Sequence, residues 1–183
     1  MSTGTNAPRP SEEDRAMPGL ISRFLAEDHE RLDALLTQAV AAPGEVELTA
    51  YGAFREGLLR HIALEEKILL PAARTARGGE PVPQARRLRV DHGAIAALLV
   101  PTPTPELAVE LRKILGPHNL VEEGEGGLYE LCDALLSAEA GAIVERMRAY
   151  PPVKVARYQD GPRVCRTAEE ALRVSALQSE KRG

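Results

Sequence analysis

Apolar residues recur at helical spacing in four long stretches of the chain, and short segments rich in proline and glycine separate them. Apolar positions three to four residues apart predict amphipathic α-helices, and proline and glycine end such helices. The sequence therefore predicts helices from Pro18 to the Ala-Pro-Gly segment at 42–44, from about 46 to 76, from about 84 to 100, and from Pro105 to beyond residue 130. A shorter amphipathic helix at 139–149 and one further helical turn near 167–177 are expected to follow.

Connections of only a few residues cannot carry the chain back to its starting end, so the four long helices must run antiparallel to their neighbours. The predicted fold is an all-α, up-down-up-down four-helix bundle with a short extra helix near the C-terminus. We expect the bundle to span residues 19–150. A polar, proline-bearing N-terminal tail at 1–18 is predicted to be disordered, and two consecutive prolines introduce a C-terminal tail at 151–183.

Composition supports a helical protein and argues against several kinds of partner. Hydrophobic residues make up 44% of the 183 positions but aromatic residues only 3%, so the apolar content comes mainly from alanine and leucine, which favour helix. The net charge of −4 indicates neither nucleic acid nor an anionic membrane as a partner. No apolar run approaches the roughly 18 residues of a membrane-spanning helix, and no secretory signal precedes the bundle. We therefore expect a cytoplasmic protein.

The two halves of the bundle repeat one motif. An Asp-His pair in the first and third helices is followed, in the second and fourth helices, by His-x-x-x-Glu-Glu. A histidine and a glutamate four residues apart share one face of a helix, so both can coordinate a metal beside that face. All four histidines of the chain belong to this pattern, whose six candidate metal ligands are His29, His61, Glu65, His92, His118 and Glu122.

Counting residues from each connecting loop, at about 1.5 Å per helical residue, places the six side chains near one level of the bundle. A single inward histidine is usually an ordinary hydrogen-bonded core residue. Four histidines and two glutamates together would cost several kcal/mol to bury without a compensating cation. The set therefore predicts a metal centre. The following residues, Glu66 and Glu123, are rotated off this face, so we expect them to be solvated or to support the ligands.

Imidazole and carboxylate ligands suit iron, manganese or zinc better than calcium or magnesium. Six ligands in two equivalent halves are too many for one tetrahedral zinc ion. They fit two metal ions, each with two imidazoles, bridged by two carboxylates. The two cysteines have no metal-type spacing, and Cys132 lies about 15 Å along a regular helix from Glu122, so we expect it to pack in the core.

These motifs resemble those of the hemerythrin family, and in particular the bacterial-type cation-binding domains named for their His-His-Glu pattern. The resemblance covers roughly residues 20–150. It implies that the four histidines are terminal ligands of two non-haem iron ions. It further implies that Glu65 and Glu122 bridge the irons, with an oxo or hydroxo group between them.

The chain departs from the oxygen-carrying members of that family in three places. Ala96 stands where they have a further histidine, one turn after the third-helix ligand, and Glu122 replaces an aspartate that lies one residue further along. Glycines at 124, 126 and 127 follow directly, and each costs about 1 kcal/mol in a helix relative to alanine, so we expect a bulge or local break there. The missing histidine leaves an exchangeable position open on both irons, which argues against simple reversible oxygen carriage.

Two classes of function remain open from the sequence. In the first, the di-iron centre handles peroxide, dioxygen or nitric oxide, with possible catalase- or peroxidase-like activity. Tyr51 and Tyr129 are then candidates for lining the ligand pocket, ordinary packing being the alternative. In the second, the protein holds or senses iron without turnover, and a partner recognises the metal-stabilised state, for which the 151–183 tail is the favouring feature.

Overall fold

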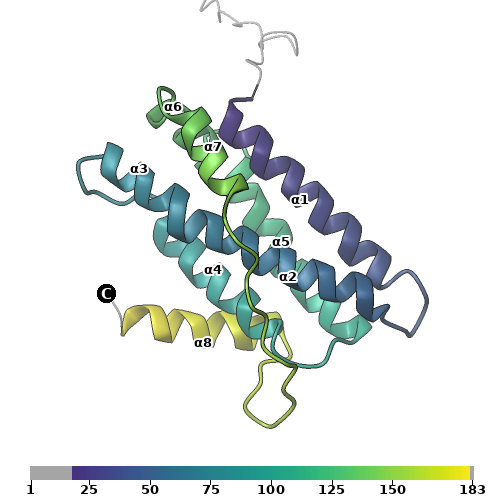
Figure 1. Cartoon of the computed structure of the whole chain (residues 1–183). Helices are drawn as coiled ribbons and strands as arrows, with labels where there is room; N and C mark the ends of the chain where they lie inside the picture. Colours follow the sequence, from purple (N-terminus) through teal and green to yellow (C-terminus); the bar gives the residue numbers. More distant parts are fainter. Residues whose placement is uncertain (1–17, 182–183) are drawn as a thin grey trace, which may run out of the picture.

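Every regular element that the structure describes between residues 18 and 181 is helical, in agreement with the predicted fold class (Figure 1). The structure is a computed structural model of the whole chain. The N-terminal tail predicted at 1–18 lies, except for Pro18, outside the described residues. The elements in chain order are α1 (Leu20–Ala39), α2 (Leu48–Leu64), the π-helical turn η2 (Glu65–Leu69), α3 (Leu70–Ala76), α4 (Ala85–Leu98), α5 (Pro105–Glu123), α6 (Leu128–Leu135), α7 (Ala140–Arg148) and α8 (Ala168–Glu180).

The second predicted helix, 46–76, is one continuous helical run, but its central turn is π-helical rather than α-helical. The π turn begins at Glu65, and the Leu70 N–H donates to the Glu65 carbonyl five residues back. Pro71 lies two residues after the π turn and lacks the N–H that would bond the Lys67 carbonyl of a regular helix. The wider turn absorbs this interruption, and π turns of this kind occur often at functional sites.

The fourth predicted helix does not run past residue 130, and that expectation was wrong. Helix α5 ends at Glu123, and α6 begins at Leu128 after a glycine turn. Gly126 has a φ of 69°, and a Cβ on Gly127 would lie 2.6 Å from the carbonyl oxygens of Glu122 and Gly124. The predicted break at the glycines is therefore confirmed, and it is a full interruption because the turn tolerates no side chain there.

The interior consists of two apolar clusters at opposite ends of the long helices, with a polar layer between them. On α1, for example, Leu25 belongs to one cluster and Leu32 to the other, and His29 lies between the two. The same order, apolar then histidine then apolar, occurs on α2 with η2, and on α4. This arrangement leaves the histidines at the middle of the long helices, where apolar packing on both sides shields them from water.

The C-terminal part of the chain closes two faces of this core. Helix α7 packs against α1, and α8 packs along α4, at the bottom of Figure 1. The α8 helix is longer than the single turn predicted near 167–177, and Thr167 caps its N-terminus by accepting a hydrogen bond from the Glu170 N–H. Cys132 is buried in the cluster of Leu128 and Met147, as predicted for a packing residue. Within the described residues, no helix is both long and apolar enough to cross a membrane.

Candidate metal centre

The polar layer contains the six predicted ligand residues, which come from five different elements. Helices α1, α2, α4 and α5 each contribute one histidine, while η2 and the end of α5 contribute the two glutamates. All six are buried, with exposed fractions from 0% for the glutamates to 8% for His29. The structure therefore brings together His29, His61, Glu65, His92, His118 and Glu122, while their role as metal ligands remains a prediction.

One set of ligand atoms combines both glutamates with the histidines of the second half. Glu65, His92, His118 and Glu122 each offer an atom, and these atoms lie within 4.8 Å of one another. His92 Nε2 is 3.0 Å from Glu65 Oε2, and His118 Nε2 is 3.3 Å from Glu122 Oε1. Four buried donor atoms at these separations can surround one cation.

The other set combines the histidines of the first half with one of the two glutamates, Glu122. His29, His61 and Glu122 offer atoms within 4.8 Å of one another. His61 Nε2 lies 3.5 Å from Glu65 Oε1, and His29 Nε2 lies 3.6 Å from Glu122 Oε2. Glu122 thus belongs to both sets, and the two oxygens of Glu65 also face histidines of different halves, which is the arrangement expected of carboxylates that could bridge two cations.

The outward Nδ1 nitrogens of the histidines face carboxylates, which leaves every Nε2 directed inward. The aspartate that precedes the lone histidine in each half faces the histidine of the next helix. His61 Nδ1 donates to Asp28 at 2.9 Å, whereas His118 Nδ1 lies 3.5 Å from Asp91 and makes no hydrogen bond. Carboxylates in this position hold the ring and make Nε2 a better ligand.

The remaining two histidines are held by the second glutamate of each Glu-Glu pair. His92 Nδ1 lies 2.9 Å from Glu66, and His29 Nδ1 makes a short contact with Glu123. Glu66 and Glu123 are partly exposed, at 24% and 39%, yet they touch the histidines as well as solvent. The sequence indicated this supporting role for the glutamates but gave none to Asp28 and Asp91, although the repeated Asp-His pair was a visible signal.

The electrostatics of the side chains favour a cation at the centre. Burial raises the pKa of Glu122, and the neighbouring charge of Glu65 raises it further. Burial lowers the pKa of His61, but the charge of Glu65 and the hydrogen bond to Asp28 outweigh this effect and raise the pKa to about 10. The buried carboxylates of Glu65 and Glu122 are surrounded by the four outer carboxylates described above. Such a cluster of negative charge attracts protons or a metal cation.

The buried atoms that face the centre fit a metal ion. Among the described residues, Glu65 Oε2, His92 Nε2 and Glu122 Oε1 are buried and make no hydrogen bond. Leaving such groups unpaired costs about 1–3 kcal/mol each. A cation between them would satisfy all three at once, and imidazole with carboxylate is the donor set of iron, manganese or zinc.

A comparison with protein families agrees with this geometry. The family model described as the hemerythrin HHE cation-binding domain matches residues 20–125, which is more than half of the chain. The chain belongs to this family. The matched segment contains all six residues of the hemerythrin-type site and ends just before α6. Searches of curated proteins and of solved structures found no significant match.

The two tyrosines considered from the sequence have different places in the hemerythrin-type bundle. Tyr51 packs in an apolar cluster, with its ring 5.7 Å from that of Phe54. The Tyr129 hydroxyl instead donates to Glu65 Oε1 at 2.7 Å in the polar layer. Burial raises the pKa of Tyr129 well above its ordinary value, as do the charges of Glu65 and Glu122. Tyr129 is therefore the residue of this site that sequence reasoning located least well.

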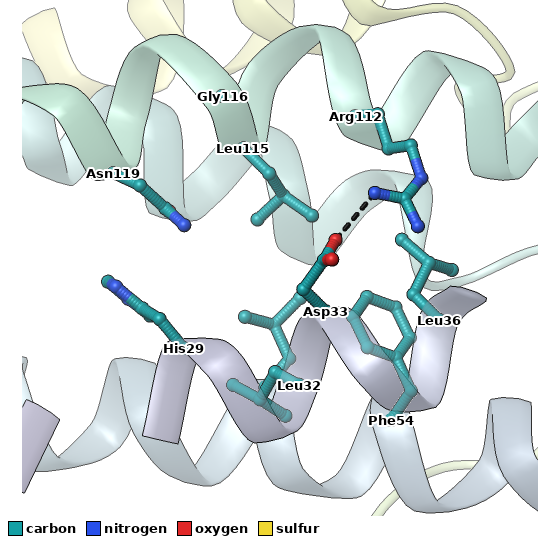
Figure 2. A pocket seen from close by; sticks show the side chains of 10 residues that line it. His29, Leu32, Asp33, Leu36, Phe54, Arg112, Leu115, Gly116 and Asn119 are labelled. Atoms are coloured by element: carbon teal, nitrogen blue, oxygen red, sulfur yellow. Dashed lines mark hydrogen bonds and ion pairs between the residues drawn. The ribbon is translucent and has the colours of Figure 1, made fainter. Parts of the chain in front are cut away.

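A small pocket beside the site has a volume of about 160 Å³. Figure 2 shows His29 and Asn119 pointing toward one another at one side of it, while Asp33 pairs with Arg112 at 2.5 Å on the other. Pockets for drug-sized ligands measure about 300–1,000 Å³. This pocket therefore suits a molecule of a few atoms. Its apolar walls come from α1, α2 and α5, and the residues are Leu32, Leu36, Phe54, Leu58 and Leu115.

Proposed function

We propose that this hemerythrin-family protein is a non-haem di-iron protein that handles peroxide, dioxygen or nitric oxide. His29 and His61 would hold one iron, and His92 and His118 the other. Glu65 and Glu122 would bridge the two ions. The observation that carries the proposal is the paired geometry, in which the two oxygens of each buried carboxylate face imidazole Nε2 atoms of different halves.

Iron is favoured over the other metals by the family and by the ligand count. Two pairs of imidazoles with two shared carboxylates leave six-coordinate ions with positions for an exchangeable ligand, and imidazole–carboxylate sites with open positions are typical of non-haem iron. When bound, the two irons supply the electrons for reducing a small oxidant and accept them again when a second molecule is oxidised.

The residues of the chain would bind, orient and shield rather than react. The outer carboxylates fix the imidazole rings, and the two apolar clusters on either side of the polar layer exclude bulk water. The pocket beside His29 admits only a small ligand. In the peroxide reaction, one molecule of hydrogen peroxide is oxidised to dioxygen while another is reduced to two molecules of water, so no further reductant is needed.

We further infer the order in which the long helices run up and down the bundle. Short connections at 40–47, 77–84 and 99–104 join α1, α2 with α3, α4 and α5. The contacts of α1 with α2, α4 with α5, and α1 with α5 support an up-down-up-down order. We assign residues 19–150 to the hemerythrin-type unit and 151–183 to an appendage whose helix α8 docks on α4.

The test combines metal analysis, an optical spectrum and a peroxide assay on the aerobically purified chain. We expect about two irons per chain, one for each ligand set, and peroxide loss with dioxygen release faster than that caused by the same concentration of iron salt. Zinc or manganese in place of iron would overturn the di-iron assignment. Iron without any peroxide consumption above the salt control would overturn the enzymatic role.

A second function, iron holding or sensing without turnover, is favoured by the position of α8. Ser175 of α8 donates to the Val90 carbonyl at 2.7 Å, and a Cβ on Gly93 would lie 2.3 Å from the Ser175 hydroxyl. This contact brackets Asp91 and His92, so the C-terminal helix lies against the backbone that carries a site histidine. A partner that binds α8 would sense iron through this contact. This function would be supported by slow peroxide consumption together with iron-dependent protection of the α8 amides from hydrogen exchange.

A further inference from the structure

Tyr129 reaches the metal centre from outside the repeated motif and outside the matched family segment. It is the second residue of α6, directly after the glycine turn, and only 1% of the residue is exposed. The turn after Glu123 folds α6 back so that it packs against both α1 and α5. The phenol ring therefore enters the polar layer from the end of the bundle, while the six other side chains enter it from its long helices.

The hydroxyl oxygen lies among the ligand atoms of one half of the site. It is 2.7 Å from Glu65 Oε1, 3.2 Å from Glu122 Oε2, 3.3 Å from His61 Nε2 and 3.4 Å from His29 Nε2. With metal–ligand bonds of 2.0–2.2 Å, two ligands at right angles on the same ion lie about 3 Å apart. All four distances are close to that separation, as expected for an oxygen that shares one ion with all four atoms.

The second half of the site has no such group. Within the part of the chain that the structure describes, the donor atoms gathered around His92 and His118 are the two imidazoles and the glutamate oxygens Glu65 Oε2 and Glu122 Oε1. The two halves, which repeat in sequence, thus differ by one oxygen donor.

We propose that the Tyr129 oxygen is a fifth protein ligand of the iron held by His29 and His61. This inference rests on the proposed di-iron function. Coordination breaks the O–H bond, the proton leaves to solvent as for other ligands that bind metals in deprotonated form, and no electron is transferred. The two irons are then inequivalent: the first carries five protein ligands and the second four, so the more open position belongs to the iron of His92 and His118.

The test is the visible spectrum of the ferric, iron-loaded protein. A phenolate bound to iron(III) gives a charge-transfer band in the visible region, and excitation in that band enhances the ring vibrations of tyrosinate in the resonance Raman spectrum. We expect both signals in the wild type and their complete loss in Tyr129→Phe, which keeps the ring and its packing. Tyr51→Phe is the matched control, because Tyr51 is equally buried but lies in an apolar cluster, and it should retain both signals.

The outcomes separate this inference from the proposed function. Iron-loaded wild type without the phenolate signals, or Tyr129→Phe that retains them, overturns the inference and leaves Tyr129 as a hydrogen-bond donor to Glu65. Wild type that binds no iron overturns the di-iron function itself, and the inference with it. Loss of the signals in Tyr129→Phe, with one or both irons still bound and the helical circular dichroism unchanged, supports the ligand assignment.

Discussion

The two halves of the candidate metal centre repeat one sequence motif but differ in structure. In both, an aspartate precedes the lone histidine, and a second glutamate follows the glutamate of the His-x-x-x-Glu motif. In the first half, His61 Nδ1 is 2.9 Å from its aspartate and Tyr129 lies over the Nε2 atoms, whereas in the second half His118 Nδ1 is 3.5 Å from Asp91. The repeat supplies symmetric donors, and the segment after the glycine turn, which is not repeated, makes them unequal.

The surroundings of the two halves also differ. Helices α6 and α7 pack against α1, the helix that carries His29, while α8 packs along α4, the helix that carries His92. A hydrogen bond from Ser175 fixes α8 to α4 at Val90. The first half therefore differs by a side chain inside the site, Tyr129, and the second half differs by a helix packed against its outer surface, α8.

Removing the two glutamates that the halves share should have the largest effect on iron binding. We expect Glu65→Ala/Glu122→Ala to bind little iron, because each ion loses both carboxylates. Iron at 100 times its dissociation constant stabilises the wild type by about 2.7 kcal/mol. That corresponds to a rise of roughly 5–10 °C in melting temperature for a chain of this length, and the double variant should show none. Metal analysis and thermal unfolding measure both effects, with Glu145→Ala, an exposed carboxylate, as the control.

Removing one imidazole from either half should have the next largest effect. We expect His61→Ala and His118→Ala each to reduce the bound iron from about two per chain to one or fewer, because each ion has two imidazoles. His61→Ala should retain more iron than His118→Ala if Tyr129 helps to hold the first ion. Iron content by mass spectrometry is the measurement, and Lys67→Ala is the control. Wild-type stoichiometry in either histidine variant would contradict the ligand assignment.

Much of the fold, and the meeting of the six candidate ligands in one layer, could be predicted because both follow from periodicity. Helical spacing located α1, α4 and the run from α2 to α3, and the same spacing placed each histidine among apolar neighbours. Counting residues from the loops was enough to expect one shared level. The family resemblance is what favours iron over other metals, because the spacing of imidazoles and carboxylates alone does not select one.

The features that could not be predicted from the sequence depend on local backbone geometry or on the direction in which a helix leaves a turn. The π turn that begins at Glu65 ends two residues before Pro71, but a proline within a helical pattern does not specify whether the chain kinks, bulges or ends. The glycines predicted an interruption after Glu122, yet the direction in which α6 leaves is set by tertiary packing. Tyr129 was therefore visible only as a candidate, and its contact with Glu65 required the structure.

The outer aspartates offer a finer comparison of the two halves. Supporting carboxylates of this kind typically contribute 10- to 100-fold in metal affinity. We expect Asp28→Asn to weaken iron binding within that range and Asp91→Asn to weaken it less, because the contact of Asp28 with His61 is shorter and is a hydrogen bond. Competition with a chelator measures both affinities, and Asp33→Asn, which removes an ion pair outside the site, is the control. Equal losses would mean that the aspartates act alike despite the different distances.

The smallest effect is expected from a substitution that adds a further ligand to the second half and changes only the rate of peroxide consumption. Ala96 is half-buried on α4, one turn after His92, so a histidine at this position extends from the same helix face toward the half that lacks a tyrosine. If the more open position lies on the iron of His92 and His118, Ala96→His should fill it and lower peroxide consumption several-fold, while leaving the iron content near two and the tyrosinate signals intact. Ala97→His, one residue further along and off that face, should leave turnover unchanged. Steady-state peroxide loss and dioxygen release, normalised to bound iron, measure the effect. Equal turnover in Ala96→His and wild type would place the reactive position elsewhere, since a ligand added to the second half can slow the reaction only if peroxide must bind there.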